Sequence, residues 1–351
     1  MIYPANFEEK IGFDRIREQV TALCSTPSAK AKLAEEGFST SADEIERRLS
    51  LMNEMRSLLM LERDFPDGDY PDPAPLVAKI RVEGSYLLAA EADQLRKALV
   101  TVGAIAEFIL GRGGARYPRL WELSRRVTLF PEIVRAIDAI LDDRGEVKDS
   151  ASPELQQVRR AIREREGQAA KRLQQVLQRA KQAGIVDADA VLSVRDGRPV
   201  IPVAAANKRK LQGFIHDESA TGRTFYVEPV EVVEINNELK ELEYAERREV
   251  VKVLSTFTES IRPDAEAIAD AGDYLSSVDM IRAKARWALA NDAGKPILST
   301  DDRLELRTAR HPLLQQTLRA QGREVVPLDL ALDRRKHILV ISGPNAGGKS
   351  V

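Results

Sequence analysis

A glycine-rich octet at residues 343–350 carries the side chains with the clearest chemistry in this sequence. It fits the pattern G-x-x-x-x-G-K-[S/T], a loop whose backbone N–H groups cradle the phosphates of a nucleotide. In such a loop Lys349 reaches the β- and γ-phosphate oxygens, and the Ser350 hydroxyl binds Mg²⁺. The pattern therefore predicts ATP and Mg²⁺ as ligands. The predicted nucleotide-binding residues are Gly343, Pro344, Asn345, Ala346, Gly347, Gly348, Lys349 and Ser350.

The elements around the octet decide what it does. Residues 338–341, Ile-Leu-Val-Ile, precede it and predict the buried strand that such a loop requires. The printed sequence contains neither the helix that would follow the loop nor a later acidic strand to position Mg²⁺ and water. We therefore expect a fragment of an ATPase that binds ATP without hydrolysing it, and we predict no catalytic residue within it. The alternative is a structural fragment whose loop holds no nucleotide.

Composition limits the class of protein. The chain has 351 residues, of which 5% are aromatic and 31% charged, and this favours two or three mainly helical domains. Its formal charge of −2 means that nucleic-acid binding has to come from local basic patches. Cys24 is the single cysteine, so it forms no internal disulfide and is expected to be buried.

The same sequence contains no run of signal-peptide or membrane-spanning character, so we expect a cytoplasmic protein. Three histidines lie far apart without cysteine partners, and we predict no metal site beyond nucleotide-bound Mg²⁺.

Breaks rich in Pro, Gly and Asp divide the chain into segments. Before residue 152 the patterns predict capped helices, with a break at Thr26, a capping box from Ser41 to Glu44, and later helices over residues 89–110 and 118–141. The predicted fold class is mainly α. Its segments are a helical core at 1–152, a first long helix at 153–190, a β-rich insert at 191–229, a second long helix at 230–262, a helical return at 263–295, and the start of a truncated α/β nucleotide-binding domain at 296–351.

The first long helix has a heptad seam. Its apolar or small residues recur in steps of three, four and seven, which is typical of a coiled coil. A second helical run at residues 230–261 has a similar apolar side. We interpret the two runs as an antiparallel coiled-coil arm, the alternative being a pair of ordinary core helices. The seam residues are Leu155, Val158, Ile162, Ala169, Leu173, Val176, Ala180 and Ala183.

The insert between the two helices has a β pattern. Residues 191–194, 199–203, 212–216 and 224–227 are short strand candidates separated by glycines at the turns. A small β-rich domain at the end of the arm follows from this pattern.

Charge is polarised along the arm. Residues 154–181 hold eight basic against three acidic residues, and residues 191–227 of the insert hold six against three. Residues 228–249 reverse the sign, with eight Glu against three basic residues. Attraction between paired helices explains part of this pattern. The sequence places no such partner near Lys208, Arg209 and Lys210, so we predict that they contact phosphate, and we add Arg223 to the predicted nucleic-acid-binding residues.

Three segments near the end of the chain resemble the entry to the ATPase domain of MutS proteins. They are residues 310–314 (Arg-His-Pro-Leu-Leu), 325–329 (Val-Val-Pro-Leu-Asp) and 341–350. Two positions differ from mismatch-repair MutS: Ala346 replaces the usual methionine, and Val351 replaces the threonine that commonly follows. These differences indicate a subfamily.

Residues 149–155 and 216–229 resemble the lever and clamp of the second bacterial MutS subfamily, which lacks the mismatch-reading domain. The start of the chain carries core-like helices and no Phe-x-Glu wedge within a small α/β domain, as in that subfamily. The resemblance covers nearly the whole chain.

The resemblance implies a homodimeric ATPase clamp that closes lever arms around nucleic acid when ATP binds. In this subfamily the substrate is branched DNA, in suppression of recombination, or the collided ribosome with its rRNA, and both remain open here. A nuclease module is typical of the subfamily and would lie after Val351. His311 lies in the motif near the nucleotide domain, where shaping that domain's first turn is at least as good an interpretation as a functional one.

A different class of protein shares part of this pattern. Coiled-coil ATPases of the ABC and chromosome-maintenance type also have G-P-N-x-x-G-K-S loops. In those proteins the loop usually precedes the arms, whereas here it follows them.

Overall fold

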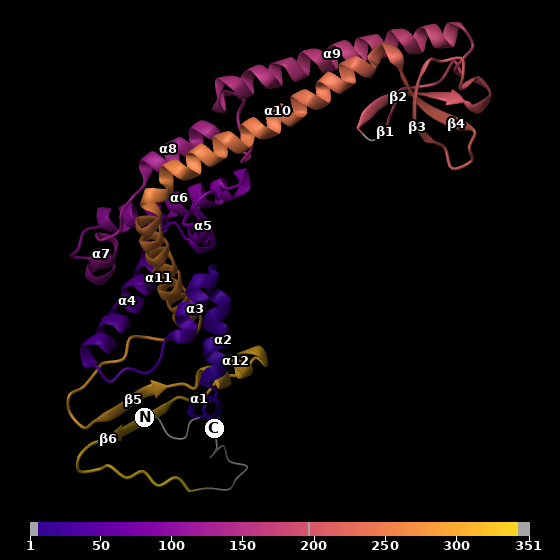
Figure 1. Cartoon of the computed structure of the whole chain (residues 1–351). Coiled ribbons are helices and arrows are strands. Elements are labelled where there is room, and N and C mark those ends of the chain that lie inside the picture. Colours follow the sequence, from indigo (N-terminus) through magenta and orange to yellow (C-terminus); the bar gives the residue numbers. More distant parts are fainter. Residues whose placement is uncertain (1–5, 196, 343–351) are drawn as a thin grey trace. The chain divides into compact units, whose positions relative to one another are not determined.

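The computed structural model describes residues 6–195 and 197–342 (Figure 1). The described chain divides into two compact units. The first unit consists of the residues up to 78, residues 94–130 and the residues from 264 onward. The second consists of residues 79–93 and 131–263. The predicted mainly helical class is confirmed.

The first unit begins with short capped helices. They are α1 (Phe7–Lys10), α2 (Phe13–Leu23), α3 (Pro27–Glu35) and α4 (Ala42–Leu61). The Thr26 hydroxyl accepts a hydrogen bond from the Ala29 N–H at 3.0 Å, and Ser41 accepts one from the Glu44 N–H at 3.4 Å. Both predicted breaks are therefore N-caps, which satisfy N–H groups that the helix itself leaves free.

The next helices are α5 (Ala74–Ile80), α6 (Ala89–Gly111), α7 (Pro118–Ser124) and α8 (Pro131–Ile140). The expected continuous helix over residues 118–141 is wrong, because the structure breaks it between α7 and α8. Pro131 explains the break, since it has no N–H to donate inside a helix and is well suited to the first position of a new one.

Helix α11 (Ala265–Ala290) forms the centre of the first unit and packs against α2, α3 and α4. Leu275 and Val278 are fully buried in its core cluster. Arg282 is also fully buried, and its charge is matched by Asp279 at 2.8 Å on the same helix. The predicted burial of Cys24 is confirmed, and burial raises the pKa of its thiol to about 11.

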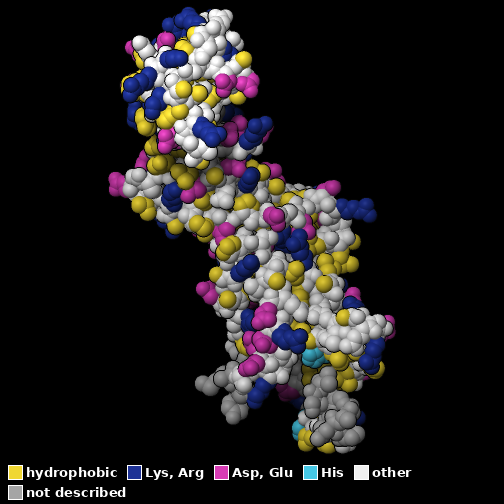
Figure 2. All heavy atoms as spheres, turned by 90° about the vertical axis from the view of Figure 1, so that its right-hand side faces the viewer, with side chains coloured by type: hydrophobic (Ala, Val, Ile, Leu, Met, Phe, Trp, Pro, Cys, Tyr) yellow, Lys and Arg dark blue, Asp and Glu magenta, His cyan; other side chains and the backbone are white. Residues whose placement is uncertain are grey.

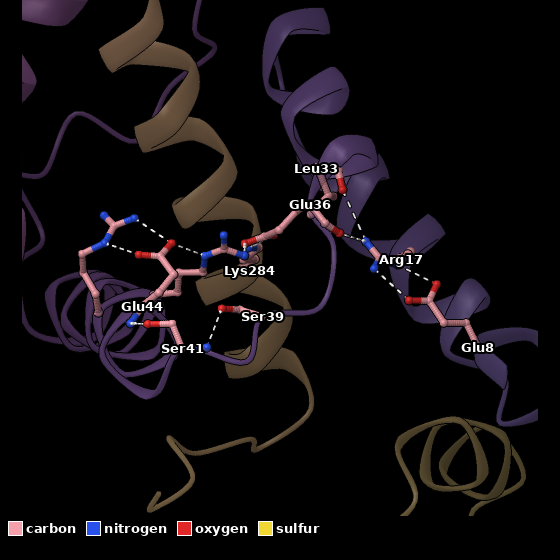
Figure 3. A network of polar contacts seen from close by, with 10 residues as sticks. Glu8, Arg17, Leu33, Glu36, Ser39, Ser41, Glu44 and Lys284 are labelled. Carbon is pink, nitrogen blue, oxygen red and sulfur yellow. Dashed lines mark hydrogen bonds and ion pairs between the residues drawn. The ribbon is translucent and has the colours of Figure 1, made fainter. Parts of the chain in front are cut away.

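A polar network ties four elements of this unit together (Figure 3). Glu36, just after α3, forms ion pairs with Arg48 of α4, at 3.3 Å, and with Lys284 of α11. Its backbone carbonyl accepts a hydrogen bond from Arg17 of α2 at 3.0 Å. The network fixes the loop between α3 and α4 against the central helix.

The C-terminal part of this unit contains β5 (Leu304–Ala309), α12 (Pro312–Ala320) and β6 (Leu328–Leu332). The two strands pair antiparallel. His311 is the N-cap of α12, where its Nδ1 accepts a hydrogen bond from the Leu314 N–H at 3.4 Å. This capping bond matches the structural interpretation of that histidine.

The predicted buried strand at residues 338–341 is wrong for this structure. The segment is not in a strand, and Ile338 and Val340 are 76% and 82% exposed. An apolar run becomes a buried strand only when neighbouring strands pair with its backbone and other elements cover its faces. In the described part of the chain the only strands of this region, β5 and β6, pair with each other.

The second unit is dominated by two long helices, α9 (Pro153–Gln182) and α10 (Val230–Ile261). Between them lie β1 (Ser193–Arg195), β2 (Arg198–Ala204), β3 (Gly213–Glu218) and β4 (Thr224–Pro229), close to the four strand candidates. The strands form one antiparallel sheet in the order β1-β2-β4-β3. Short 3₁₀ turns flank these elements: η1 (Asp149–Ala151), η2 (Ala205–Asn207) and η3 (Arg262–Asp264).

Helix α9 is shorter than expected. It ends at Gln182 and not at residue 190, and Gly184 follows with a left-handed φ of 64° that terminates the helix. Ala183, the last seam residue, therefore lies outside the helix. The sheet packs against this end of α9 through a shared apolar cluster. Its members include Leu173, Val176, Leu177, Ile201, Val203, Val227 and Val232.

The two long helices run antiparallel and side by side (Figure 1). Cross-helix contacts join Arg159 to Glu246 at 2.7 Å and Arg165 to Glu238 at 2.8 Å. Partner numbers fall on α10 as they rise on α9, as antiparallel pairing requires. Among the described helices of the whole chain, none has the length and apolar character needed to cross a membrane.

Candidate functional site

The sequence predicted two groups of site residues, and the structure describes one of them. The nucleotide-binding octet, residues 343–350, lies outside the described residues. The four predicted nucleic-acid-binding residues all lie in the sheet domain of the second unit. We call Lys208, Arg209, Lys210 and Arg223 the basic patch.

Strand pairing brings the two parts of the basic patch together. Ala204, the last residue of β2, pairs with Thr224, the first residue of β4. One step further, the Ala205 N–H donates to the Arg223 carbonyl at 2.9 Å. Arg223 therefore lies beside the η2 turn that leads to Lys208.

The turn that carries the three consecutive cations is held in place by backbone and side-chain hydrogen bonds. The Asn207 side chain donates to the carbonyl of Ile185 at 3.0 Å, and the Asn207 carbonyl accepts from the Lys210 N–H at 2.8 Å. Leu211 then packs against the apolar cluster. The cations are thus presented by a fixed backbone, while their side chains are exposed.

The charges of the basic patch are not neutralised by neighbours. All four side chains are exposed, and no ion pair joins any of them to another described residue. Two arginines of the same sheet contrast with them: Arg195 pairs with Asp217 at 2.9 Å, and Arg198 pairs with Glu228 at 2.9 Å. Figure 2 shows blue side chains gathered along one side of the lobe that the sheet forms.

Two neighbouring aromatic residues of β4 each carry a cation. The Lys208 ammonium lies 4.4 Å from the centre of the Phe225 ring, and the Arg195 guanidinium lies 3.8 Å from that of Tyr226. Successive residues of a strand face opposite sides of the sheet. The two cation–ring contacts therefore lie on opposite faces of the sheet. Of the two cations, Arg195 is the one whose charge is already matched, by Asp217.

A buried carboxylate holds the sheet against α10. Glu228, at the end of β4, is 1% exposed. It accepts hydrogen bonds from Arg198 of β2, at 2.9 Å, and from Asn236 of α10, at 2.6 Å. His216 Nε2 of β3 lies 2.5 Å from the same carboxylate. Three strands and a helix therefore meet at one charged group.

The long helices contribute both matched and unmatched charge. Arg159 of α9 reaches Glu246 and also Asp149, and its hydrogen bond lowers the pKa of the Asp149 carboxyl below its ordinary value. The expected attraction between oppositely charged helices is present here. Three cations nearer the sheet, Lys171, Arg172 and Arg179, are exposed and form no ion pair with a described residue.

Sequence reasoning found the cations but missed the residues that arrange them. Phe225 lies in the strand candidate at residues 224–227 and Glu228 directly follows it, but the sequence does not say which ring meets a lysine or which carboxylate is buried. Those facts depend on the register of β2, β3 and β4.

The described residues contain no cluster of metal-binding side chains. No group of three or more His, Cys, Asp or Glu side chains that could hold a metal ion occurs among the described residues. The first unit has a cavity of about 720 Å³ lined mainly by apolar side chains such as Phe13, Met52 and Trp287. None of the four basic-patch residues lines it.

Comparison with curated proteins finds relatives along almost the whole chain. A Thermomicrobium roseum protein named Endonuclease MutS2 is 33% identical over an alignment of 352 positions that covers 97% of this chain and 43% of the relative. A Bacillus velezensis protein of the same name is 31% identical over 341 residues, or 97% of this chain and 42% of the relative. A Bacillus subtilis protein named Putative endonuclease MutS2 is also 31% identical, with the same coverage.

The chain thus spans less than half the length of the curated relatives it matches. A scan against protein-family models found no match.

Proposed function

The chain belongs to the MutS family, and from that premise we propose that it is part of an ATP-dependent clamp for structured nucleic acid. In this proposal the paired helices α9 and α10 are the arm, and the sheet β1–β4 is the element that contacts the substrate. The substrate is branched DNA or the rRNA of a stalled, collided ribosome, and binding of the two side by side distinguishes them.

The observation that carries the proposal is the basic patch. Four exposed cations, unmatched by described carboxylates, lie together on a sheet at the end of two long helices. Cations without a partner gain most from a phosphate backbone, because no internal ion pair has to be broken first. The neighbouring Arg195 and Arg198 lack that advantage, since each is paired with a carboxylate.

The arm supports a mechanical role for the patch. Two helices of 30 and 32 residues are each about 45 Å long at 1.5 Å per residue, longer than the core of a small domain requires. Glu228 links the sheet to α10 through Asn236, so a movement of that helix would be passed to the patch. We propose that this link orients the patch toward the substrate.

ATP, Mg²⁺ and a homodimer complete the proposal. They are supported by the sequence of residues 343–350 and by family membership. Lys349 and Ser350 would contact the phosphates and Mg²⁺, and bound nucleotide would supply the energy for closing. The proposal does not extend to cleavage, which the names of the relatives attach to those longer proteins.

The test compares two substrates with charge-changed variants. Binding of a four-way DNA junction and of purified ribosomes is measured side by side near physiological salt, with and without ATP, in a version of the protein as long as its curated relatives. The variant is Lys208→Glu with Arg209→Glu, and the matched control is Arg195→Gln, which removes a cation that Asp217 already neutralises.

We expect the double variant to lose at least tenfold in affinity for the true substrate, since two reversed charges repel phosphate, while Arg195→Gln stays close to wild type. ATP-dependent preference for the junction would make this an anti-recombination clamp, and preference for ribosomes a translation-rescue ATPase. Unchanged affinity of the double variant for both substrates would contradict the proposal.

A further inference from the structure

The aromatic ring of Phe225 bears on how the basic patch works. Phe225 lies on β4, a central strand, where it pairs with Val203 of β2 and with Glu218 of β3. Its side chain is half-buried and packs against the apolar cluster. A ring held between two strands and a core is a rigid platform, and Lys208 lies over it at 4.4 Å.

A lysine side chain is normally costly to fix in place. It has several rotatable bonds, and its freedom is lost when the ammonium binds a phosphate. A cation over an aromatic face is attracted by the negative face of the ring. Stacking on Phe225 therefore restricts Lys208 before the substrate arrives, and less entropy is lost on binding.

The opposite face of the same strand provides an internal comparison. Tyr226 follows Phe225 and holds Arg195 at 3.8 Å, closer than Phe225 holds Lys208. Arg195 is also paired with Asp217 at 2.9 Å. Phe225 thus contacts a cation, Lys208, that has no carboxylate partner, whereas Tyr226 contacts Arg195, whose charge is matched by Asp217.

From this contrast we infer that Phe225 is a positioning residue for the nucleic-acid contact: its ring holds the Lys208 ammonium ready for a phosphate. The inference rests on the proposed function and adds a residue that does not itself carry charge. It also identifies Lys208 as the preorganised member of the basic patch, since Arg209, Lys210 and Arg223 stack on no described aromatic ring.

A double-mutant cycle tests the inference in the full chain. The variants are Phe225→Leu, Lys208→Gln and the two combined, and the probe is whichever of the four-way DNA junction and the ribosome binds the wild type more tightly. Phe225→Leu keeps an apolar side chain but removes the ring face, and we expect a loss of about two- to fivefold in affinity. Once Lys208 is Gln, the same Phe225→Leu change should have no further effect.

Two controls separate positioning from packing. Phe225→Tyr keeps a ring and should bind like the wild type, whereas Tyr226→Leu removes the ring beneath an already neutralised arginine and should change affinity by less than the Phe225→Leu variant. Thermal melting of each variant shows that binding is compared between folded proteins. If Phe225→Leu unfolds the sheet, Phe225→Met takes its place with the same expectation.

The possible results separate a failure of the Phe225 inference from a failure of the proposed function. A loss from Phe225→Leu that persists unchanged in the Lys208→Gln background would show a packing role and overturn the inference, as would wild-type affinity of Phe225→Leu. If Lys208→Gln alone has no effect while Lys208→Glu with Arg209→Glu still loses affinity, the inference fails and the patch proposal stands. If neither probe binds the wild type, or that charge-reversed variant binds like it, the patch proposal fails and the inference with it.

Discussion

Two arginines and one lysine of the same small sheet differ in what surrounds them. Arg195 and Arg198 each face a carboxylate at 2.9 Å, whereas Lys208 faces an aromatic ring. At the scale of residues, this difference decides which cation is available to an external phosphate. The count of basic residues in the sequence does not distinguish them.

Glu228 is the residue on which the sheet most depends. Its buried carboxylate neutralises Arg198 and accepts from Asn236. Glu228→Ala leaves Arg198 without its carboxylate and Asn236 without its acceptor. Because the Arg198 side chain is partly exposed and also donates to Asn237, we expect a loss of about 1–3 kcal/mol in the free energy of unfolding of this unit, the range for leaving a buried polar group unsatisfied.

Urea unfolding followed by circular dichroism measures the effect, with Glu241→Ala as the matched control. Glu241 lies exposed on α10 and forms no ion pair with a described residue. Its removal should change stability by less than about 0.5 kcal/mol. Equal, small effects of the two changes would show that Glu228 is not the anchor of the sheet.

The sequence singles out Lys208, Arg209 and Lys210 because a run of three cations is visible in one dimension, and Arg223 was added from the same insert. That these residues bind nucleic acid stays a prediction. The roles of Phe225 and Glu228 were beyond the sequence. Whether a strand phenylalanine meets a lysine, or whether a glutamate is buried, depends on which distant segments pair with one another. Arg198 and Asn236 are 38 residues apart in the sequence, and both contact Glu228.

At the scale of elements, two glycines differ in whether the structure has room for a side chain at their position. A Cβ on Gly213, the first residue of β3, would lie 2.2 Å from the Glu228 carbonyl oxygen. A Cβ on Gly167, in the exposed middle of α9, would meet nothing within 4 Å. The first glycine is needed for close approach of two strands, whereas the second only weakens a helix.

We therefore expect Gly213→Ala to destabilise the second unit, because backbone has to move to admit the methyl group. Gly167→Ala should stabilise α9 by about 0.5–1 kcal/mol. Thermal melting of the two variants checks both signs. A neutral Gly213→Ala would mean that β3 and β4 are less closely packed than described.

Long helices and short strands were predictable because their patterns are local. N-caps at Thr26 and Ser41, both ends of α10, and all four strands of the sheet follow from spacing and turn residues. Residues 338–341 show the limit: their apolar run has strand character, but a strand needs neighbours, and the described structure supplies none for it. A local pattern gives a segment strand propensity, but the strand forms only when other segments pair with it.

At the scale of the whole molecule, a formal charge of −2 conceals strong local polarity. Acidic residues of α10 match two cations of α9, in the Arg159–Glu246 and Arg165–Glu238 pairs, and leave the sheet with unmatched positive charge. A protein of this kind does not bind polyanions through its net charge. We propose that it binds them mainly through the basic patch.

That claim predicts the salt dependence of binding. Each phosphate contact made by a cation contributes about −0.9 to the slope of log affinity against log salt concentration on duplex DNA. Replacing Lys208, Arg209, Lys210 and Arg223 together by Gln should make the slope for a four-way DNA junction shallower by about 3–4. A control with the same charge loss replaces four exposed cations of the first unit that form no ion pair with described residues: Lys10, Arg15, Lys30 and Arg63.

The most direct measurement is this slope, for the wild type, the patch variant and the control, from about 50 to 250 mM salt. We expect a clearly shallower slope for the patch variant and an unchanged slope for the control. Equal slopes for all three proteins would contradict this expectation, because the basic patch would then make no phosphate contact.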